Sequence, residues 1–274
     1  MTLRLRRLLT ISLVFLAAEL LTSAQPQPRM ISVGDRRLAV YCEGDAARSP
    51  TVILIPAGGS TAKDWVKVQP EVSGFARVCS YDHANFGASD KAPVKLQSAD
   101  EVVEDLHGWL KASGEKAPFI LVAHSIAGIY ARRFLAKYRG EIAGLVFVDS
   151  SHEEQVLRLH ELDPQGPAPD DITARLGYFV KPGERLEWRT DLPLIVLARG
   201  KPTPRKARDG SDSQNNRMTE EQFVAWDRIW RGFQEDLAKR STHGELRIAE
   251  QSGHFIQRDQ PELVIQAIRG LVRP

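Results

Sequence analysis

The sequence predicts an α/β fold, in which a mostly parallel central sheet carries helices on both faces. The main observation is a series of short apolar runs, which are typical of strands that are buried on both sides. These runs alternate with segments of helical periodicity, as in parallel strands that are joined by crossover helices. The length of 274 residues, with 42% hydrophobic and 26% charged residues, suits one large domain of this class.

Residues 1–24 have the pattern of a secretory signal peptide. Three arginines within residues 4–7 precede an apolar run over residues 8–18, and small residues occupy positions 22–24. This order predicts cleavage after Ala24 and export of the domain that spans residues 25–274, to the periplasm or out of the cell. The alternative is an uncleaved anchor, but the apolar run is shorter than the about 20 residues that cross a bilayer. We therefore expect no stable membrane insertion after cleavage.

The charge balance argues against a nucleic-acid partner. Lysines and arginines total 37 and acidic residues total 35, and residues 1–24 account for the whole excess. The remaining chain is nearly neutral, whereas nucleic-acid binders carry a basic face. The two cysteines, Cys42 and Cys79, lack the paired spacing of metal ligands, so we expect neither a metal nor another cofactor.

The elements follow in order from local patterns. Two extended runs, residues 30–33 and 38–42, flank Gly34-Asp35, which predicts a β-hairpin. Six apolar runs predict further strands, at residues 52–55, 78–81, 119–123, 145–148, 194–197 and 246–249. Helices are predicted at residues 98–112, 126–138, 219–239 and 261–272. The first of these helices begins with a capping box of Ser98 and Glu101, and the last has a proline in its first turn.

Two segments interrupt the alternation of strands and helices. Residues 150–191 are rich in Pro, Glu and Arg and are too long for a simple connection, so they predict a cap insertion with short helices. Residues 199–217 carry more basic than acidic side chains. We expect this second segment to be a solvated loop, and recognition of an acidic substrate is the alternative.

The junction between the strand at 119–123 and the helix at 126–138 contains the candidate nucleophile, Ser125. Ala123 and Ala127, two residues to either side, are small, as a tight turn between strand and helix requires. A helix N-terminus also favours developing negative charge. A serine hydroxyl needs a base to remove its proton, and we expect His254, which follows Ser125 in the chain and precedes the last helix, to be that base.

The other histidines are expected to have lesser roles. His124 is predicted to pack behind the site, because neighbouring residues on such a turn point apart. His83 and His152 are candidates for the mouth of a pocket. The remaining three, His107, His160 and His243, are predicted to lie on the surface.

These motifs together resemble the α/β-hydrolase superfamily, over residues 30–274. The run from Ala123 to Ala127 stands where the family has G-x-S-x-G. The run from Tyr81 to Ser89 is similar to the family's D-x-x-G-x-G-x-S turn, with Asn85 in place of a glycine; asparagine also adopts left-handed backbone angles. The run from Ser252 to Gln257 resembles the loop of the family's catalytic histidine. The resemblance implies the α/β-hydrolase fold, with a small cap insertion over the site.

The resemblance also implies a Ser-His-Asp triad with an oxyanion hole. Many relatives place the acid after the strand that follows the insertion, but here Arg199 and Gly200 occupy that place. We therefore expect the acid to be Asp149, at the end of the strand at 145–148, as in some members. The alternatives are Asp209 and Asp212, and a helix cap is the alternative role of Asp149. The oxyanion donors are expected to be the N–H groups of Gly59 and Ile126, and Trp65 is expected to pack in the core rather than line the acyl pocket.

A disulfide is a further implication of the resemblance. Cys42 and Cys79 fall on strands that are neighbours in this superfamily, so an oxidising compartment would permit a bridge between them. The alternative is a pair of buried thiols.

The function expected from the resemblance is that of an exported serine hydrolase, which cleaves a small-molecule carboxylic ester through an acyl-enzyme on Ser125. One alternative is a peptidase or amidase similar to proline iminopeptidase, and haloperoxidase-like or carbon–carbon hydrolase chemistry could use the same triad. Another is a catalytically inactive binding protein with the same fold. Neither the particular substrate nor the oligomeric state is predicted.

Overall fold

The computed structural model describes residues 27–94, 96–166, 188, 190–203 and 218–272. The predicted signal peptide and the two alternative acids, Asp209 and Asp212, lie outside these residues. Among the described residues, no helix has both the length and the apolarity needed to cross a membrane.

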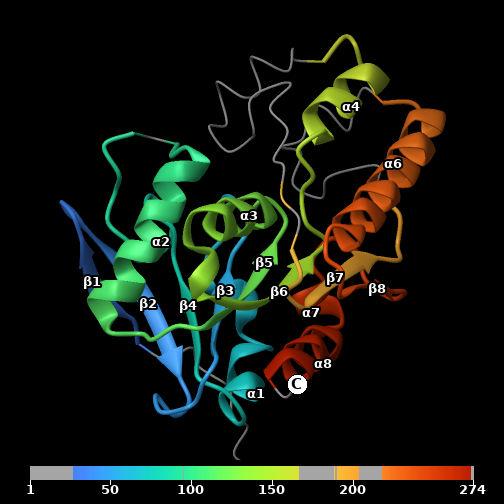
Figure 1. Ribbon diagram of the computed structural model, residues 1–274. Coiled ribbons are helices and arrows are strands. Elements are labelled where there is room, and N and C mark those ends of the chain that lie inside the picture. The colour runs from blue at the N-terminus through green and yellow to red at the C-terminus, as the bar shows by residue number, and fades with distance from the viewer. Residues whose placement is uncertain (1–26, 95, 167–187, 189, 204–217, 273–274) are drawn as a thin grey trace, which may run out of the picture.

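The centre of the molecule is an eight-stranded sheet with the order β1-β2-β4-β3-β5-β6-β7-β8 (Figure 1). The strands are β1 (Arg29–Val33), β2 (Arg36–Glu43), β3 (Thr51–Ile55), β4 (Val78–Tyr81), β5 (Phe119–His124), β6 (Ile142–Val148), β7 (Leu194–Arg199) and β8 (Gly244–Ala249). The predicted hairpin pairs β1 with β2, and β2 joins β4 in antiparallel register. The other pairs are parallel, so the predicted mostly parallel sheet is confirmed.

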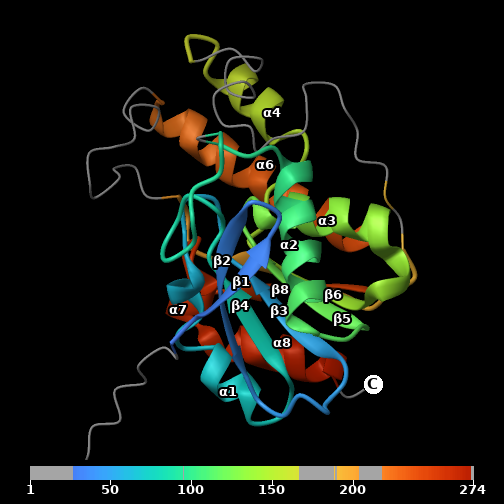
Figure 2. The ribbon, with the colours of Figure 1, turned by 90° about the vertical axis from the view of Figure 1, so that its left-hand side faces the viewer.

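Each face of the sheet packs against its own apolar core. Successive side chains of a strand point to opposite faces. In β3, Ile53 and Ile55 belong to the core under α2 (Ala99–Ser113) and α3 (Ala127–Tyr138), whereas Val52 and Leu54 belong to the core under α8 (Pro261–Val272). The two views of the ribbon show these helices on the two sides of the strands (Figures 1 and 2).

Two of the long helices begin with a capping box, and the sequence predicts the one at α2. Ser98 and Glu101 form the capping box of α2, and Thr219 and Gln222 form another at the start of α6 (Glu220–Lys239). The bounds of the shorter elements were not predicted; these elements are η1 (Ala62–Trp65), α1 (Gln69–Ser73), η2 (Arg139–Glu141) and α7 (Ile256–Asp259). The predicted cap insertion contains α4 (Gln155–Leu162), while residues 167–187 within it lie outside the described residues. An apolar cluster that includes Trp226 joins α4 to α6.

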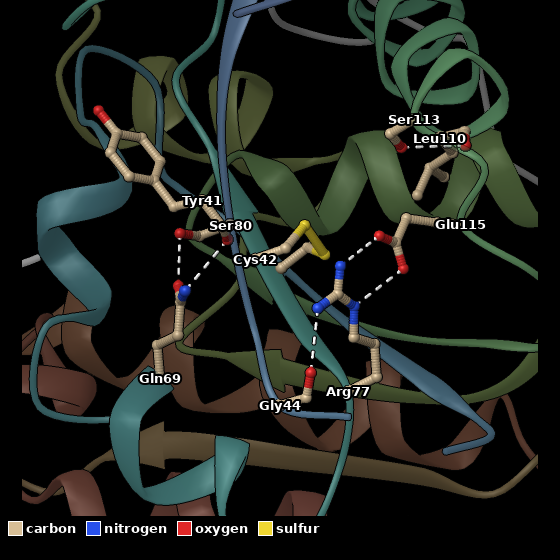
Figure 3. Close-up of a disulfide and its surroundings, with 10 residues drawn as sticks. Tyr41, Cys42, Gly44, Gln69, Arg77, Ser80, Leu110, Ser113 and Glu115 are labelled. Carbon is tan, nitrogen blue, oxygen red and sulfur yellow. Dashed lines mark hydrogen bonds and ion pairs between the residues drawn. A yellow bond between two sulfur atoms is a disulfide. The ribbon is translucent and has the colours of Figure 1, made fainter. Parts of the chain in front are cut away.

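Cys42 and Cys79 are bridged by a disulfide (Figure 3). They are directly opposite one another in the β2–β4 register, which brings the two side chains to the same face of the sheet. Arg77 lies beside the bridge, where it donates to Glu115 over 2.7 Å and to the Gly44 carbonyl over 3.1 Å. Of the two alternatives, the bridge is therefore confirmed over the free thiols.

The prediction that His107 lies on the surface is wrong. Only 8% of the residue is exposed, and its ring stacks on Tyr138 at a centroid distance of 3.7 Å. His107 lies one helical turn after Val103, so it belongs to the side of α2 that packs against α3. Of the other two histidines predicted at the surface, His243 is exposed and His160 is half-buried.

Candidate active site

Ser125 occupies a strained turn between β5 and α3. Its φ angle of 57° is in the left-handed region, where residues other than glycine are rare. The turn is held because the Ser125 N–H donates to the Val148 carbonyl over 3.1 Å. A Cβ on Gly128 would lie 2.6 Å from the Cβ of Ser150, so the turn needs a glycine there. The small residues beside Ser125 were predicted from the sequence, whereas the need for Gly128 was not.

Asp149 and His254 are brought together at the same edge of the sheet. Asp149 is fully buried at the end of β6, and its carboxylate Oδ2 accepts a hydrogen bond from His254 Nδ1 over 2.6 Å. That bond makes Nδ1 the protonated nitrogen and leaves Nε2 free to accept a proton. The alternative role of Asp149 as a helix cap finds no support in the hydrogen bonds of its side chain.

Three further donors converge on the Asp149 carboxylate. Oδ1 accepts from Trp230 Nε1 over 2.8 Å and from the Arg199 N–H over 3.1 Å, and Oδ2 accepts from Arg199 Nη1 over 3.0 Å. Burial by itself would raise the pKa of Asp149, but the bond with His254, the Arg199 charge and the Trp230 bond outweigh it. The pKa of Asp149 therefore lies well below its usual range, and the group is ionised at neutral pH.

Ser125 lies close to this pair, although its hydroxyl forms no hydrogen bond with His254 among the described residues. The closeness follows from His124, the residue before Ser125, whose Nε2–H donates to the His254 carbonyl over 2.9 Å. Ser125 and Asp149 also follow adjacent parallel strands, β5 and β6. Catalytic hydrogen bonds are often long before substrate binds and tighten afterwards.

His124 packs behind the site, as predicted. It is fully buried, and its Nδ1 accepts a hydrogen bond from Gln257 Nε2 over 3.0 Å. Burial, helped by the nearby His254, lowers the pKa of His124 to about 3. His124 is therefore a neutral ring with a fixed tautomer, which supports the backbone of His254.

His83 and His152 were both predicted at the mouth of a pocket: His83 does line a small pocket beside Gly58, whereas His152 packs against Phe233 on α6, so the prediction is wrong for His152. His83 is 5% exposed, and its Nε2–H donates to the Pro56 carbonyl over 3.0 Å. His83 thus supports the strand end that leads to Gly58 and Gly59. His152 is also buried, because its ring stacks on Phe233 at 4.4 Å with an interplanar angle of 1°.

The first residues of the predicted cap insertion are held by hydrogen bonds beside the site. The Ser150 N–H and carbonyl are bound by the amide of Gln234 on α6, over 3.2 and 2.8 Å. The Ser151 N–H donates to the Ser125 carbonyl over 2.9 Å, and the Ser151 carbonyl accepts from Arg132 over 3.0 Å. Arg132 also forms an ion pair with Glu153 at 3.4 Å.

The two expected oxyanion donors are placed in suitable backbone. Gly59 has a φ angle of 76° in a turn that the Ser60 N–H closes onto the Ala57 carbonyl over 3.1 Å. Ile126 directly follows Ser125 and precedes the first residue of α3. Gly59 is exposed, so its N–H can be approached from solvent.

Asp64 links this turn to the loop of His254, a connection that the sequence analysis missed. Its buried carboxylate accepts hydrogen bonds from the Ser60 hydroxyl and from Arg258 on α7. No local pattern in the sequence indicates the bond between Asp64 and Arg258, because these residues are 194 positions apart. Trp65, the next residue, is fully buried in the core under α8, which confirms the expected packing role.

Arg199 was also missed, because the sequence analysis assigned it to a solvated loop. Arg199 instead ends β7, and only 8% of the residue is exposed. The apolar run before it continues the strand by two residues, and parallel pairing with β6 then points Arg199 at Asp149.

The described residues contain one group that could be considered for a metal ion. It consists of Cys42, Cys79 and Glu115, whose donor atoms lie within 4.8 Å of one another. The two sulfurs are joined in the disulfide, so they are not available as thiolate ligands.

The sequence matches the model of the family described as "Alpha/beta hydrolase family" over residues 52–267. The "Probable transporter efuK" of Hormonema carpetanum is 30% identical over 141 residues, which are 50% of this chain and only 20% of that protein. The protein YqjL of Bacillus subtilis is 24% identical over 241 residues, 84% of this chain and 87% of YqjL.

Solved structures share the same architecture. A thermophilic esterase from Thermogutta terrifontis superposes with a TM-score of 0.60 and 20% identity, over 90% of this chain and 98% of the esterase. At this identity the likeness concerns the fold alone.

Proposed function

This chain belongs to the alpha/beta hydrolase family, and from that premise we propose that it is an exported serine hydrolase that cleaves a small-molecule carboxylic ester. The observation that carries the proposal is the 2.6 Å hydrogen bond between His254 and the ionised Asp149, beside the strained turn of Ser125. A solved esterase has the same fold, and the ester is the part of the proposal that the comparison of esters with amides tests.

The reaction proceeds in two halves. His254 Nε2 takes the proton of the Ser125 hydroxyl as its oxygen attacks the ester carbonyl carbon, and Asp149 stabilises the imidazolium that forms. The N–H groups of Gly59 and Ile126 donate to the carbonyl oxygen as it becomes negative. His254 returns the proton to the leaving alcohol, which leaves an acyl group on Ser125. Water, activated by the same histidine, then releases the acid.

Labelling with a fluorophosphonate probe tests the nucleophile. We expect covalent labelling of the mature protein at the peptide that contains Ser125, and its loss in Ser125→Ala together with ester hydrolysis. Ser73→Ala is the matched control, because the Ser73 hydroxyl donates to the Pro70 carbonyl within α1, outside the site. Labelling that persists in Ser125→Ala would disprove the assignment.

Two further measurements test the remaining parts of the proposal. Matched esters and amides of the same acyl group distinguish an esterase from a peptidase or amidase, and faster cleavage of the amide would reverse the assignment. N-terminal sequencing of protein recovered outside the cytoplasm should begin at Gln25. Unprocessed protein retained in the cell would contradict export.

A further inference from the structure

Arg199 and His254 share one oxygen of a buried carboxylate. Arg199 Nη1 donates to Asp149 Oδ2 over 3.0 Å, and His254 Nδ1 donates to the same oxygen over 2.6 Å. The backbone of Arg199 also binds Oδ1, over 3.1 Å. Asp149 is fully buried and Arg199 is 8% exposed, so water screens this group of charges only weakly.

The guanidinium of Arg199 is held in place from two other sides. Its central carbon lies 4.8 Å from the centre of the Trp230 ring, and the Trp230 N–H itself binds Asp149. Its Nη2 donates to Asp227 Oδ1 over 3.1 Å and to Thr203 Oγ1 over 2.7 Å. A planar fork fixed at both ends keeps its charge at one position beside Asp149.

We propose that Arg199 is a positioning residue that extends the activity toward acidic pH, by opposing protonation of His254 through their shared partner Asp149. This inference rests on the proposed function. A carboxylate stabilises an imidazolium, and a cation on the same carboxylate offsets part of that stabilisation.

The other charged groups around His254 do not replace Arg199 among the described residues. His124, from β5, is neutral because its pKa is lowered to about 3. Arg258, on α7, is stacked over Phe255 and is paired with the buried Asp64. Asp227, on α6, binds the other terminal nitrogen of Arg199 and partly balances its charge.

The pH profile of kcat/KM tests the inference. Arg199→Gln removes the charge and keeps a hydrogen-bond donor, and we expect the acidic midpoint of the profile to rise by about one pH unit. Arg199→Lys keeps the charge, and its midpoint should stay close to that of the wild type. Asp227→Asn removes a negative charge, so its midpoint should move in the opposite direction, to lower pH.

Arg247→Gln is the matched control, because Arg247 on β8 forms a partly exposed ion pair with Glu245. Its midpoint should not move. If Arg199→Gln and Arg199→Lys lower kcat equally with an unchanged midpoint, Arg199 has only a structural role and the inference is wrong. If Arg199→Gln fails to fold, an unchanged or raised midpoint in Asp227→Asn overturns the inference.

Imidazole titration by ¹⁵N NMR separates this inference from the proposed function. The His254 signal is assigned by its loss in His254→Gln, and its midpoint is read in the resting protein without turnover. A wild type that neither hydrolyses esters nor labels would refute the proposed function. A midpoint that is the same in wild type and Arg199→Gln would refute the role of Arg199, whatever the activity.

Discussion

The carboxylate of Asp149 accepts four hydrogen bonds, which an asparagine of the same size cannot do. An amide at this position replaces one oxygen acceptor by an N–H donor. The His254 ring then either turns away from residue 149 or takes the tautomer in which Nδ1 has no proton. We expect Asp149→Asn to lower kcat for ester hydrolysis by about 10⁴-fold, as for the equivalent change in a serine protease. Steady-state kinetics with the best ester measure the effect.

The control for Asp149→Asn is Asp191→Asn, an exposed carboxylate paired with Arg139. Its turnover should equal that of the wild type. Near-normal turnover in Asp149→Asn would mean that the catalytic acid is Asp209 or Asp212 instead.

At the scale of single residues, positions next to a strand end could be predicted from the sequence. Asp149 directly follows an apolar run and Ser125 follows one after a single histidine, and parallel strands bring their carboxyl ends to one edge of the sheet. Trp230 could not be predicted, because it reaches Asp149 across 81 residues from the middle of a helix. Such a contact depends on how α6 lies against β7, which no local pattern specifies.

Among the elements, α6 contributes most to the rigidity of the site. Gln234 is fully buried and binds both backbone groups of Ser150, the residue after Asp149. Gln234→Ala leaves a buried N–H and a buried carbonyl without partners, so we expect it to lower the unfolding free energy by about 2–4 kcal/mol. Urea denaturation followed by circular dichroism measures the loss.

Glu235→Ala serves as the comparison, because Glu235 is the exposed neighbour on the same helix. Its effect should stay within about 0.5 kcal/mol. Equal losses in the two variants would mean that the bonds to Ser150 add nothing to stability.

The elements themselves could be predicted where they are long and capped. The period of the apolar residues and the capping box located α2, and the eight strands were found at apolar runs. The bounds of the four-residue elements η1 and α7 could not be predicted, because one turn of helix carries too few residues to show a period. Both belong to the site, through Asp64 and Arg258.

For the molecule as a whole, buried neutral histidines make stability depend on pH. The unfolded chain binds a proton at His124 near pH 6.5, whereas burial lowers the pKa in the folded chain to about 3. Stability is therefore complete above pH 6.5 and falls below it, by about 1.4 kcal/mol per pH unit from this group. His83, whose pKa burial also lowers, adds to the loss. Urea midpoints measured between pH 7 and pH 4 should show it.

Substitution of His124 tests the origin of this slope. Below pH 6.5, the unfolding free energy of His124→Gln should fall less steeply with decreasing pH than that of the wild type. The difference in slope should be about 1.4 kcal/mol per pH unit. His243→Gln, at an exposed histidine, should keep the slope of the wild type. A slope that is equal in all three proteins would contradict the account.

The bonds that hold residues 150–153 determine where this protein could be recombined with a relative. Cap segments are natural units of exchange between proteins with one scaffold, because they set the substrate while the sheet sets the chemistry. A chimera joined directly after Asp149 would put foreign residues at positions 150 and 151. The main-chain bonds of these positions with Gln234 and Ser125 depend on the path of the chain, so the change would disturb the proposed acid and nucleophile together. A foreign cap should therefore be grafted after Glu153. This junction keeps residues 150–153 and their contacts beside Ser125 and Asp149, while the new cap changes the substrate specificity.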